Sequence, residues 1–170
     1  MELNKYKRTM IMLISLALIL AFGVMTSIGE EKMKRSDKRY GVTTKVEMIK
    51  VDDSEGHIIQ IAESTGFDVS TGAVAVSRNL YDLIKGNGTV QGYTTMRDPD
   101  GGNVRYTKAV GKVTTTLSPS GKPITTMEGT YSLVKGTGTW EGFQGGGTWK
   151  GKILGGGVYI MDWEGEFTKK

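Results

Sequence analysis

Aromatic residues that could line a ligand site recur in the strand-like parts of the sequence. Tyr81, Tyr131, Tyr159 and Trp163 each stand in phase with apolar neighbours that alternate along the chain. Such side chains combine an apolar body with one polar atom, so the tyrosine hydroxyls could orient a small apolar ligand in a cavity. Simple core packing would produce the same pattern and is the favoured interpretation, with a ligand cavity as the alternative.

The other candidates for chemistry are weaker. His57 is the single histidine, and it follows a turn at the start of a predicted strand, where a solvated side chain is expected. A lone histidine cannot form a multi-histidine metal site, and no Ser–His–Asp arrangement is evident. The segment Asp98–Asn103 resembles a calcium loop, but its glycine comes too early and Ala109 stands where the closing glutamate should be. We therefore predict no metal site and no cofactor.

Three carboxylates near the C-terminus alternate along one predicted strand. Asp162, Glu164 and Glu166 share one face, and the aromatic Trp163 and Phe167 share the other. Paired carboxylates can perform acid–base chemistry when their surroundings separate their pKa values. Because aromatic side chains claim the inside of such a strand, we expect these three to form a solvated outer face.

The composition indicates how these residues are positioned. The chain has 25 glycines without a collagen period, no cysteine, and many segments rich in Thr, Val and Ile. Clusters of turn-forming residues separate these segments, most clearly at Asp52–Gly56, Arg97–Asn103 and Ser118–Pro123. The pattern predicts an all-β domain of short antiparallel strands that is held together without disulfides. Within it, Thr65-Gly66 and Thr71-Gly72 are predicted to separate short segments.

An internal repeat contains several of the glycines. The segment Tyr81–Tyr93 matches Tyr131–Phe143 at its Tyr, Leu, Lys, Thr and glycine positions. Glycines within strand patterns mark bulges or sharp coiling, which a small barrel needs to close. A phosphate-binding loop is disfavoured, because no helix pattern and no Gly-Lys-Ser/Thr follows. We assign a structural role to the six matched glycines, Gly86, Gly88, Gly92, Gly136, Gly138 and Gly142.

The second copy and the residues after it carry a family resemblance. The segment Gly136–Gly151, with its repeated Gly-Thr-Trp, resembles the glycine–aromatic hairpin of allene oxide cyclase and dirigent-like, or calycin-like, barrels. The resemblance extends over roughly residues 81–167. It implies a closed barrel of eight antiparallel strands around a mostly apolar cavity, without a cofactor and often trimeric. The catalytic acids and water-holding residues of that family have no matching positions here, so no catalytic role is transferred.

The N-terminus resembles a targeting segment. Lys5, Lys7 and Arg8 precede an uncharged, largely apolar run over residues 9–28, which ends in small residues before Glu30. We expect residues 1–29 to be a signal peptide, or an uncleaved membrane anchor helix. In both cases the remainder is exported, as a periplasmic or secreted protein, with membrane contact only through residues 9–28. Residues 30–41 are predicted to be a flexible charged spacer, and residues 42–170 the barrel.

The charge balance restricts the partners. The formal net charge is +4, but beyond residue 29 there remain 19 basic and 17 acidic residues without a long basic run. A nucleic-acid partner is therefore not expected. The sequence favours an exported barrel that binds a small apolar ligand or acts as an interaction module. The alternatives are a cofactor-free isomerase or cyclase and a structural envelope protein with a filled core.

Overall fold

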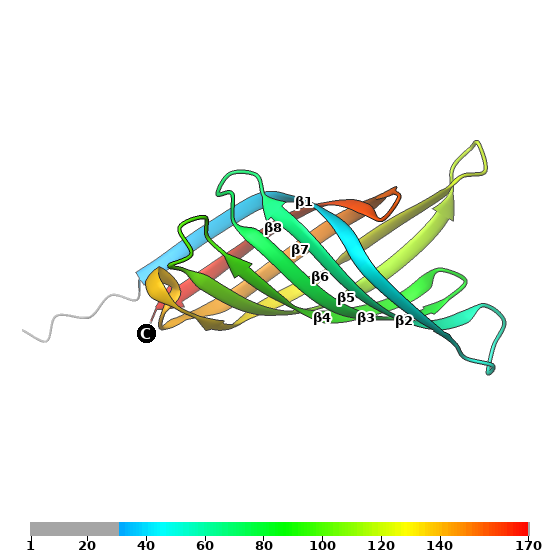
Figure 1. Cartoon of the computed structure of the whole chain (residues 1–170), viewed down its shortest axis with the longest axis horizontal. Helices are drawn as coiled ribbons and strands as arrows, with labels where there is room; N and C mark the ends of the chain where they lie inside the picture. Colours follow the sequence, from blue (N-terminus) through cyan, green and yellow to red (C-terminus); the bar gives the residue numbers. More distant parts are fainter. Residues whose placement is uncertain (1–30, 170) are drawn as a thin grey trace, which may run out of the picture. The chain divides into compact units, whose positions relative to one another are not determined.

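The computed structural model describes residues 31–169 and places them in a closed barrel of eight antiparallel strands in chain order (Figure 1). The last strand closes the barrel against the first. The predicted closed, eight-stranded all-β architecture is confirmed, and the predicted N-terminal helix lies outside the described residues. The elements are β1 (Glu31–Lys50), β2 (His57–Asp68), β3 (Val74–Ile84), β4 (Asn87–Arg97), β5 (Val104–Leu117), β6 (Pro123–Gly136), a 3-10 turn η1 (Gly138–Trp140), β7 (Phe143–Gly155) and β8 (Val158–Lys169).

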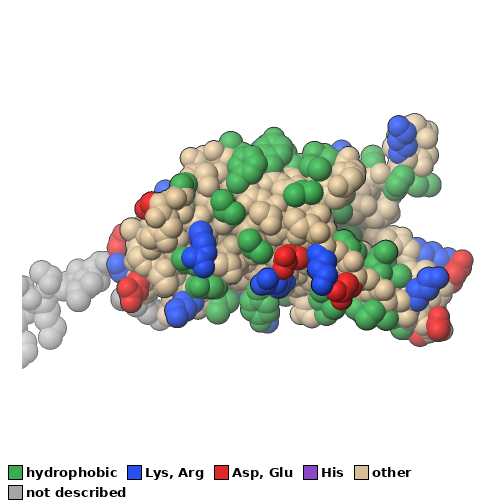
Figure 2. Space-filling model, in the orientation of Figure 1, with side chains coloured by type: hydrophobic (Ala, Val, Ile, Leu, Met, Phe, Trp, Pro, Cys, Tyr) green, Lys and Arg blue, Asp and Glu red, His purple; other side chains and the backbone are tan. Residues whose placement is uncertain are grey.

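Alternation along the strands separates the lumen from the outer face. In β8 the inward residues include Trp163 and Phe167, both buried, whereas Asp162, Glu164 and Glu166 are exposed. This division follows from the two-residue period of a strand, and it confirms the predicted acidic outer face of β8. On the side of the barrel seen in Figure 2, basic, acidic and apolar side chains are interspersed.

The prediction of a flexible spacer over residues 30–41 is wrong for residues 31–41, which form the first half of β1 and pair with β8. Arg39 points into the barrel, whereas Lys34 and Lys38 point outward and meet the acidic face of β8. Lys34 Nζ lies 2.8 Å from Glu166 Oε1, and Lys38 Nζ lies 3.4 Å from Asp162 Oδ1. Backbone hydrogen bonds of a ladder do not require apolar side chains, so a polar segment can be a strand when its partner carries the opposite charge.

The turns agree with the sequence at most positions. The loop over residues 98–103 joins β4 to β5, where the Asp98 N–H donates to the Asn103 carbonyl at 3.1 Å. Residues 118–122 join β5 to β6 in the same way, and the turn at Thr71-Gly72 joins β2 to β3. The break predicted at Thr65-Gly66 is wrong, because β2 continues to Asp68.

The two copies of the repeat adopt different local structures. The first folds as β3, a two-residue turn of Lys85 and Gly86, and β4, with both turn residues at positive φ. The second continues from β6 into η1 before β7 begins. Trp140 replaces the Val90 of the first copy and is buried beside Phe143 and Phe167. This larger buried ring accompanies the longer connection, so the two copies of the repeat do not share one local structure.

The core consists of two clusters of buried side chains. The smaller one lies at the end of the barrel where η1 and the end of β8 lie together, which we call the plugged end. It contains Leu133, Trp140, Phe143 and Phe167. The larger one includes Leu83, Val113, Met127 and Trp149. Over residues 31–169 no helix is long and apolar enough to cross a membrane. The space between the plugged end and the larger cluster is where the candidate site lies.

Candidate functional site: a cavity in the barrel lumen

The lumen is not completely filled by side chains. It contains a cavity of about 100 Å³ that is partly open to solvent, and all eight strands contribute to its lining. An engineered protein cavity of about 150 Å³ holds benzene, so this space is suited to a ligand of roughly the size of one ring. An eight-stranded barrel is just wide enough for such an arrangement.

One wall of the cavity carries small hydroxyl side chains. Ser64, Ser77, Thr94 and Thr107 come from β2, β3, β4 and β5, and each lies directly opposite the next across neighbouring strands. Thr43 of β1 extends the row, since it faces Ser64. Only the Ser77 and Thr94 hydroxyls bond to each other, at 2.8 Å. The row therefore provides both space and polar groups that can hydrogen-bond to a ligand.

The opposite wall is aromatic. Tyr131, Trp149, Tyr159 and Trp163 project from β6, β7 and β8, and the Tyr131 and Trp163 rings meet edge-on at 6.1 Å between centroids. Tyr81 joins them from β3. All four aromatic residues singled out in the sequence thus line one cavity. The tertiary structure adds Trp149, which the alternation of β7 places inward.

Glycines on other strands make room for these rings. A Cβ at Gly41 would overlap the ring of Tyr159, and one at Gly165 would overlap the hydroxyl of Tyr131. Similarly, a Cβ at Gly111 would lie 2.6 Å from the Trp149 ring. These glycines lie outside the predicted repeat, and their role becomes evident only when strands distant in the sequence are placed together.

The six glycines of the repeat lie in turns or against neighbouring backbone. Gly86, Gly138 and Gly142 have φ of +79°, +61° and +80°, a region that favours glycine. Gly138 and Gly142 lie outside the strands, which corrects the expectation that they would be strand residues. A Cβ at any of the remaining three would collide with backbone: Gly88 with Asp82, Gly92 with Arg78, and Gly136 with Trp140.

Burial keeps the tyrosine hydroxyls protonated. It raises the pKa of Tyr81 to about 12 and that of Tyr131 to about 12, and it also raises the pKa of Tyr159. At neutral pH these groups can donate hydrogen bonds but cannot act as bases. They are suited to holding an acceptor atom of a ligand rather than to removing its proton.

A buried ionic cluster borders the cavity at the plugged end. Arg39 of β1 donates from Nε to Asp68 Oδ1 at 2.7 Å, and Trp163 Nε1 donates to the same oxygen at 3.3 Å. Arg105 of β5 lies over the Trp140 ring, with Cζ 4.7 Å from the ring centroid. Arg39, Asp68 and Arg105 are exposed by 6%, 0% and 5%, respectively, so these charges are shielded from water. Only the two arginines line the cavity itself.

Sequence reasoning missed this cluster. Arg39 lies in the segment that was expected to be a spacer, and Asp68 lies beyond the break that was expected in β2. A signal was present for Arg105, because it shares the inward phase of Thr107 and Ala109 along a β-branched segment. A charged residue at an inward position of a barrel strand is unusual unless it is paired, so it marks a site for attention.

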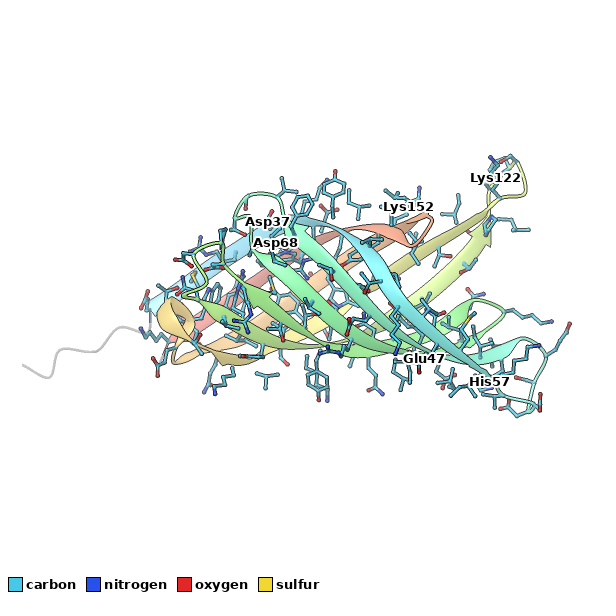
Figure 3. The ribbon with its side chains drawn as sticks, viewed as in Figure 1. Asp37, Glu47, His57, Asp68, Lys122 and Lys152 are labelled. Atoms are coloured by element: carbon cyan, nitrogen blue, oxygen red, sulfur yellow. The ribbon has the colours of Figure 1, made fainter. Side chains whose placement is uncertain are left out.

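His57 lies elsewhere. It sits near the β1–β2 loop, at the end of the barrel away from Asp68 (Figure 3). Its ring nitrogens lie 2.5 Å from Asp53 Oδ1 and 2.8 Å from Asp82 Oδ1. Within residues 31–169 no group of three or more His, Asp or Glu residues is arranged to hold a metal ion. His57 therefore links two hairpins and does not contribute to the cavity.

No protein-family model and no curated protein matches the chain. Solved structures with a similar fold include two pterocarpan synthase dirigent proteins, GePTS1 and PsPTS1, each 12% identical to this chain. For GePTS1 the match covers 85% of this chain and 94% of that chain with a TM-score of 0.43, and for PsPTS1 it covers 82% and 96% with a TM-score of 0.44. AbnU, an exo-specific intermolecular Diels-Alderase, is 10% identical over 80% of this chain and 98% of that chain, with a TM-score of 0.46. The structural neighbours are thus β-barrels of the dirigent and allene oxide cyclase-like kind to which the sequence resemblance pointed, and the likeness is one of fold.

Proposed function

We propose that this protein is an exported barrel that binds a small, largely apolar molecule in its lumen. The observation that carries the proposal is the cavity of about 100 Å³ between an aromatic wall and a row of hydroxyls. Apolar walls with a few convergent polar groups are typical of small-molecule sites. Export is supported by the basic and apolar pattern of residues 5–28, and the chain contains no cysteine that would depend on the redox state outside the cell.

Direct binding tests this function. Trp149 and Trp163 line the cavity, so a ring-sized ligand such as benzyl alcohol should change their fluorescence in a saturable way. A ligand that binds only the folded state should also raise the melting temperature with its concentration. Ala109→Leu would fill the cavity from β5 and should abolish both effects. Val110→Leu, on the outer face of the same strand, is the matched control and should leave them unchanged.

Two outcomes would contradict the proposal. One is the absence of saturable binding for both neutral and anionic ring-sized probes, which would favour the alternative of a structural envelope protein. The other is binding to Ala109→Leu that equals binding to the parent chain, because the ligand would then occupy a site outside the lumen.

A second candidate, a cofactor-free cyclase or isomerase, is favoured by one observation. Arg105 Nε and the Tyr131 hydroxyl are buried beside the cavity and have no hydrogen-bond partner. Such donors could stabilise negative charge that develops on an oxygen during ring closure. The buried carboxylate of the cluster, Asp68, already accepts hydrogen bonds from Arg39 and Trp163. A reaction that requires no strong base is therefore the form of catalysis compatible with this lumen.

A further inference from the structure

Several side chains that donate hydrogen bonds line the cavity beside the buried ionic cluster. Arg39, Arg105 and Tyr131 all line the cavity there. Arg39 is already engaged, since its Nε donates to Asp68 and its Nη2 donates to the Met96 sulfur at 3.3 Å. Arg105 and Tyr131 each keep a donor group that has no hydrogen-bond partner in the protein.

Arg105 has one N–H group, that of Nε, without a hydrogen-bond partner. Its Nη2 donates to Asp98 Oδ1 at 3.4 Å and lies 4.0 Å from Asp68 Oδ2, whereas its Nε is buried without a partner. The Tyr131 hydroxyl is also buried without a partner. Leaving a buried donor unpaired is costly, and such groups are rare in folded proteins unless something else satisfies them.

The buried charges of the cluster also leave an excess of positive charge beside the cavity. Two buried guanidinium groups face one fully buried carboxylate, that of Asp68, and the side chain of Asp98 is 23% exposed at the edge of the cluster. Burial lowers the pKa of Arg105, so its charge is only partly compensated by its neighbours. The raised pKa of Tyr131 keeps its hydroxyl as a donor. Asp68 Oδ2 also lacks a hydrogen-bond donor, but Asp68 does not line the cavity.

We infer that the ligand of this lumen carries an anionic oxygen head, of the carboxylate class, that accepts hydrogen bonds from Arg105 and Tyr131 while its ring-sized apolar body lies along the aromatic wall. This inference rests on the proposed function and specifies the chemistry of that site. Arginine is well suited to the role, because its planar fork matches a carboxylate and its charge persists when it is buried.

A pair of probes that differ in charge tests the inference. Benzoate and benzyl alcohol have the same ring, but only benzoate carries an anionic head. With the purified full chain at pH 7, we expect benzoate to bind about tenfold more tightly than benzyl alcohol, the range given by hydrogen bonds to charged groups. Isothermal titration and tryptophan fluorescence measure both affinities.

Variants identify the groups responsible. Tyr131→Phe and Arg105→Gln should each weaken benzoate binding by about tenfold and benzyl alcohol binding much less, so that the preference for benzoate is lost. Lys112→Gln removes the same charge from an exposed position on β5 and should affect neither probe. Because Arg105→Gln could disturb the buried cluster, Tyr131→Phe, which alters a single hydroxyl, provides an independent measurement, and circular dichroism checks that both variants fold.

The outcomes distinguish this inference from the proposed function. Equal affinities for benzoate and benzyl alcohol, or a benzoate preference that survives both lumen variants, would overturn the anionic head and leave lumenal binding in place. Binding of neither probe would overturn both. A benzoate preference that is lost in Lys112→Gln would place the anion on the outer surface and would also overturn the inference.

Discussion

At the scale of single residues, the two buried arginines of this barrel differ in how completely their hydrogen bonds are satisfied. Asp68 accepts hydrogen bonds from Arg39 and Trp163, which fixes the first arginine in place. Arg105 is held mainly by stacking on Trp140 and by a long contact to Asp98. Arg39 therefore has a structural role, and Arg105 keeps a hydrogen-bond donor that is available to a ligand.

His57 provides a pH-dependent contact at the other end of the barrel. Hydrogen bonds from the His57 ring to the carboxylates of Asp53 and Asp82 raise the pKa of His57 above its usual value near 6.5. A raised pKa in the folded state gives stability that is fully present below the unfolded pKa and is lost as the pH rises through the folded pKa. We expect the unfolding midpoint of the parent to exceed that of His57→Gln most at pH 5–6, and the difference to shrink towards pH 8–9.

Denaturant titrations of both chains across this range measure the effect, and the NMR titration of the single histidine gives its pKa directly. The result that contradicts the prediction is a histidine pKa at or below 6.5. A stability difference that grows with pH would have the same consequence.

At the scale of elements, the β6–β7 connection shows that the two copies of a repeated sequence can fold differently. Thr137 N–H donates to the Val104 carbonyl at 2.9 Å, and Thr139 N–H donates to Asn103 Oδ1 at 2.8 Å. These bonds anchor η1 to the start of β5 and carry Trp140 into the plugged end. In the first copy the corresponding residue is Val90, and a tight two-residue turn suffices.

Gly138 should be the most sensitive position of this connection. It has φ of +61°, and a Cβ there would collide with Asn103. Gly138→Ala should therefore lower the free energy of unfolding by about 1–3 kcal/mol, the usual scale of such strain plus lost packing. Gly101→Ala is the matched control, since Gly101 has φ of +73° but no atom within 4 Å of a Cβ.

Chemical denaturation of the two variants separates the cost of the collision with Asn103 from the cost of the positive φ. Gly101→Ala should show only the cost of a positive φ, about 1 kcal/mol, and Gly138→Ala should show more. Equal losses in both variants would mean that the anchoring of η1 adds nothing beyond the backbone conformation.

At the scale of the whole molecule, closure of the barrel depends on the first described residues. The register between β1 and β8 begins at Glu31 and Lys169 and continues to Val42 and Val158. A chain that lacked residues 31–41 would leave most of β8 without its partner on one side. Exposed edges of this kind favour aggregation, which closed barrels avoid.

The position of processing should therefore match the start of the barrel. Because we propose that the protein is exported after cleavage, we expect mass spectrometry to find its N-terminus at Glu30, and a chain that starts there to unfold cooperatively in denaturant. A chain that starts at Val42 should lose cooperativity or aggregate, because the β1–β8 ladder is absent. Cooperative folding of the shorter chain with unchanged stability would show that this ladder does not hold the barrel closed, and full-length protein in the soluble cytoplasm would contradict export.

The sequence by itself determined the all-β architecture, most turns and the inward phase of β8. Each of these depends on local physics, namely the two-residue period of a strand and the conformations that Asp and Gly adopt in turns. For the same reason the sequence identified Tyr81, Tyr131, Tyr159 and Trp163, whose positions follow from alternation within single strands.

Only the tertiary structure decided the polar part of the site. Arg39, Asp68 and Arg105 are far apart in the chain, and their pairing depends on the closure of β1 against β8 and on the register of β1 with β2. Charged residues at the start of β1 resemble a flexible spacer until the acidic face of β8 lies beside them. The lumen likewise depends on where small and large side chains from different strands meet, which no local pattern records.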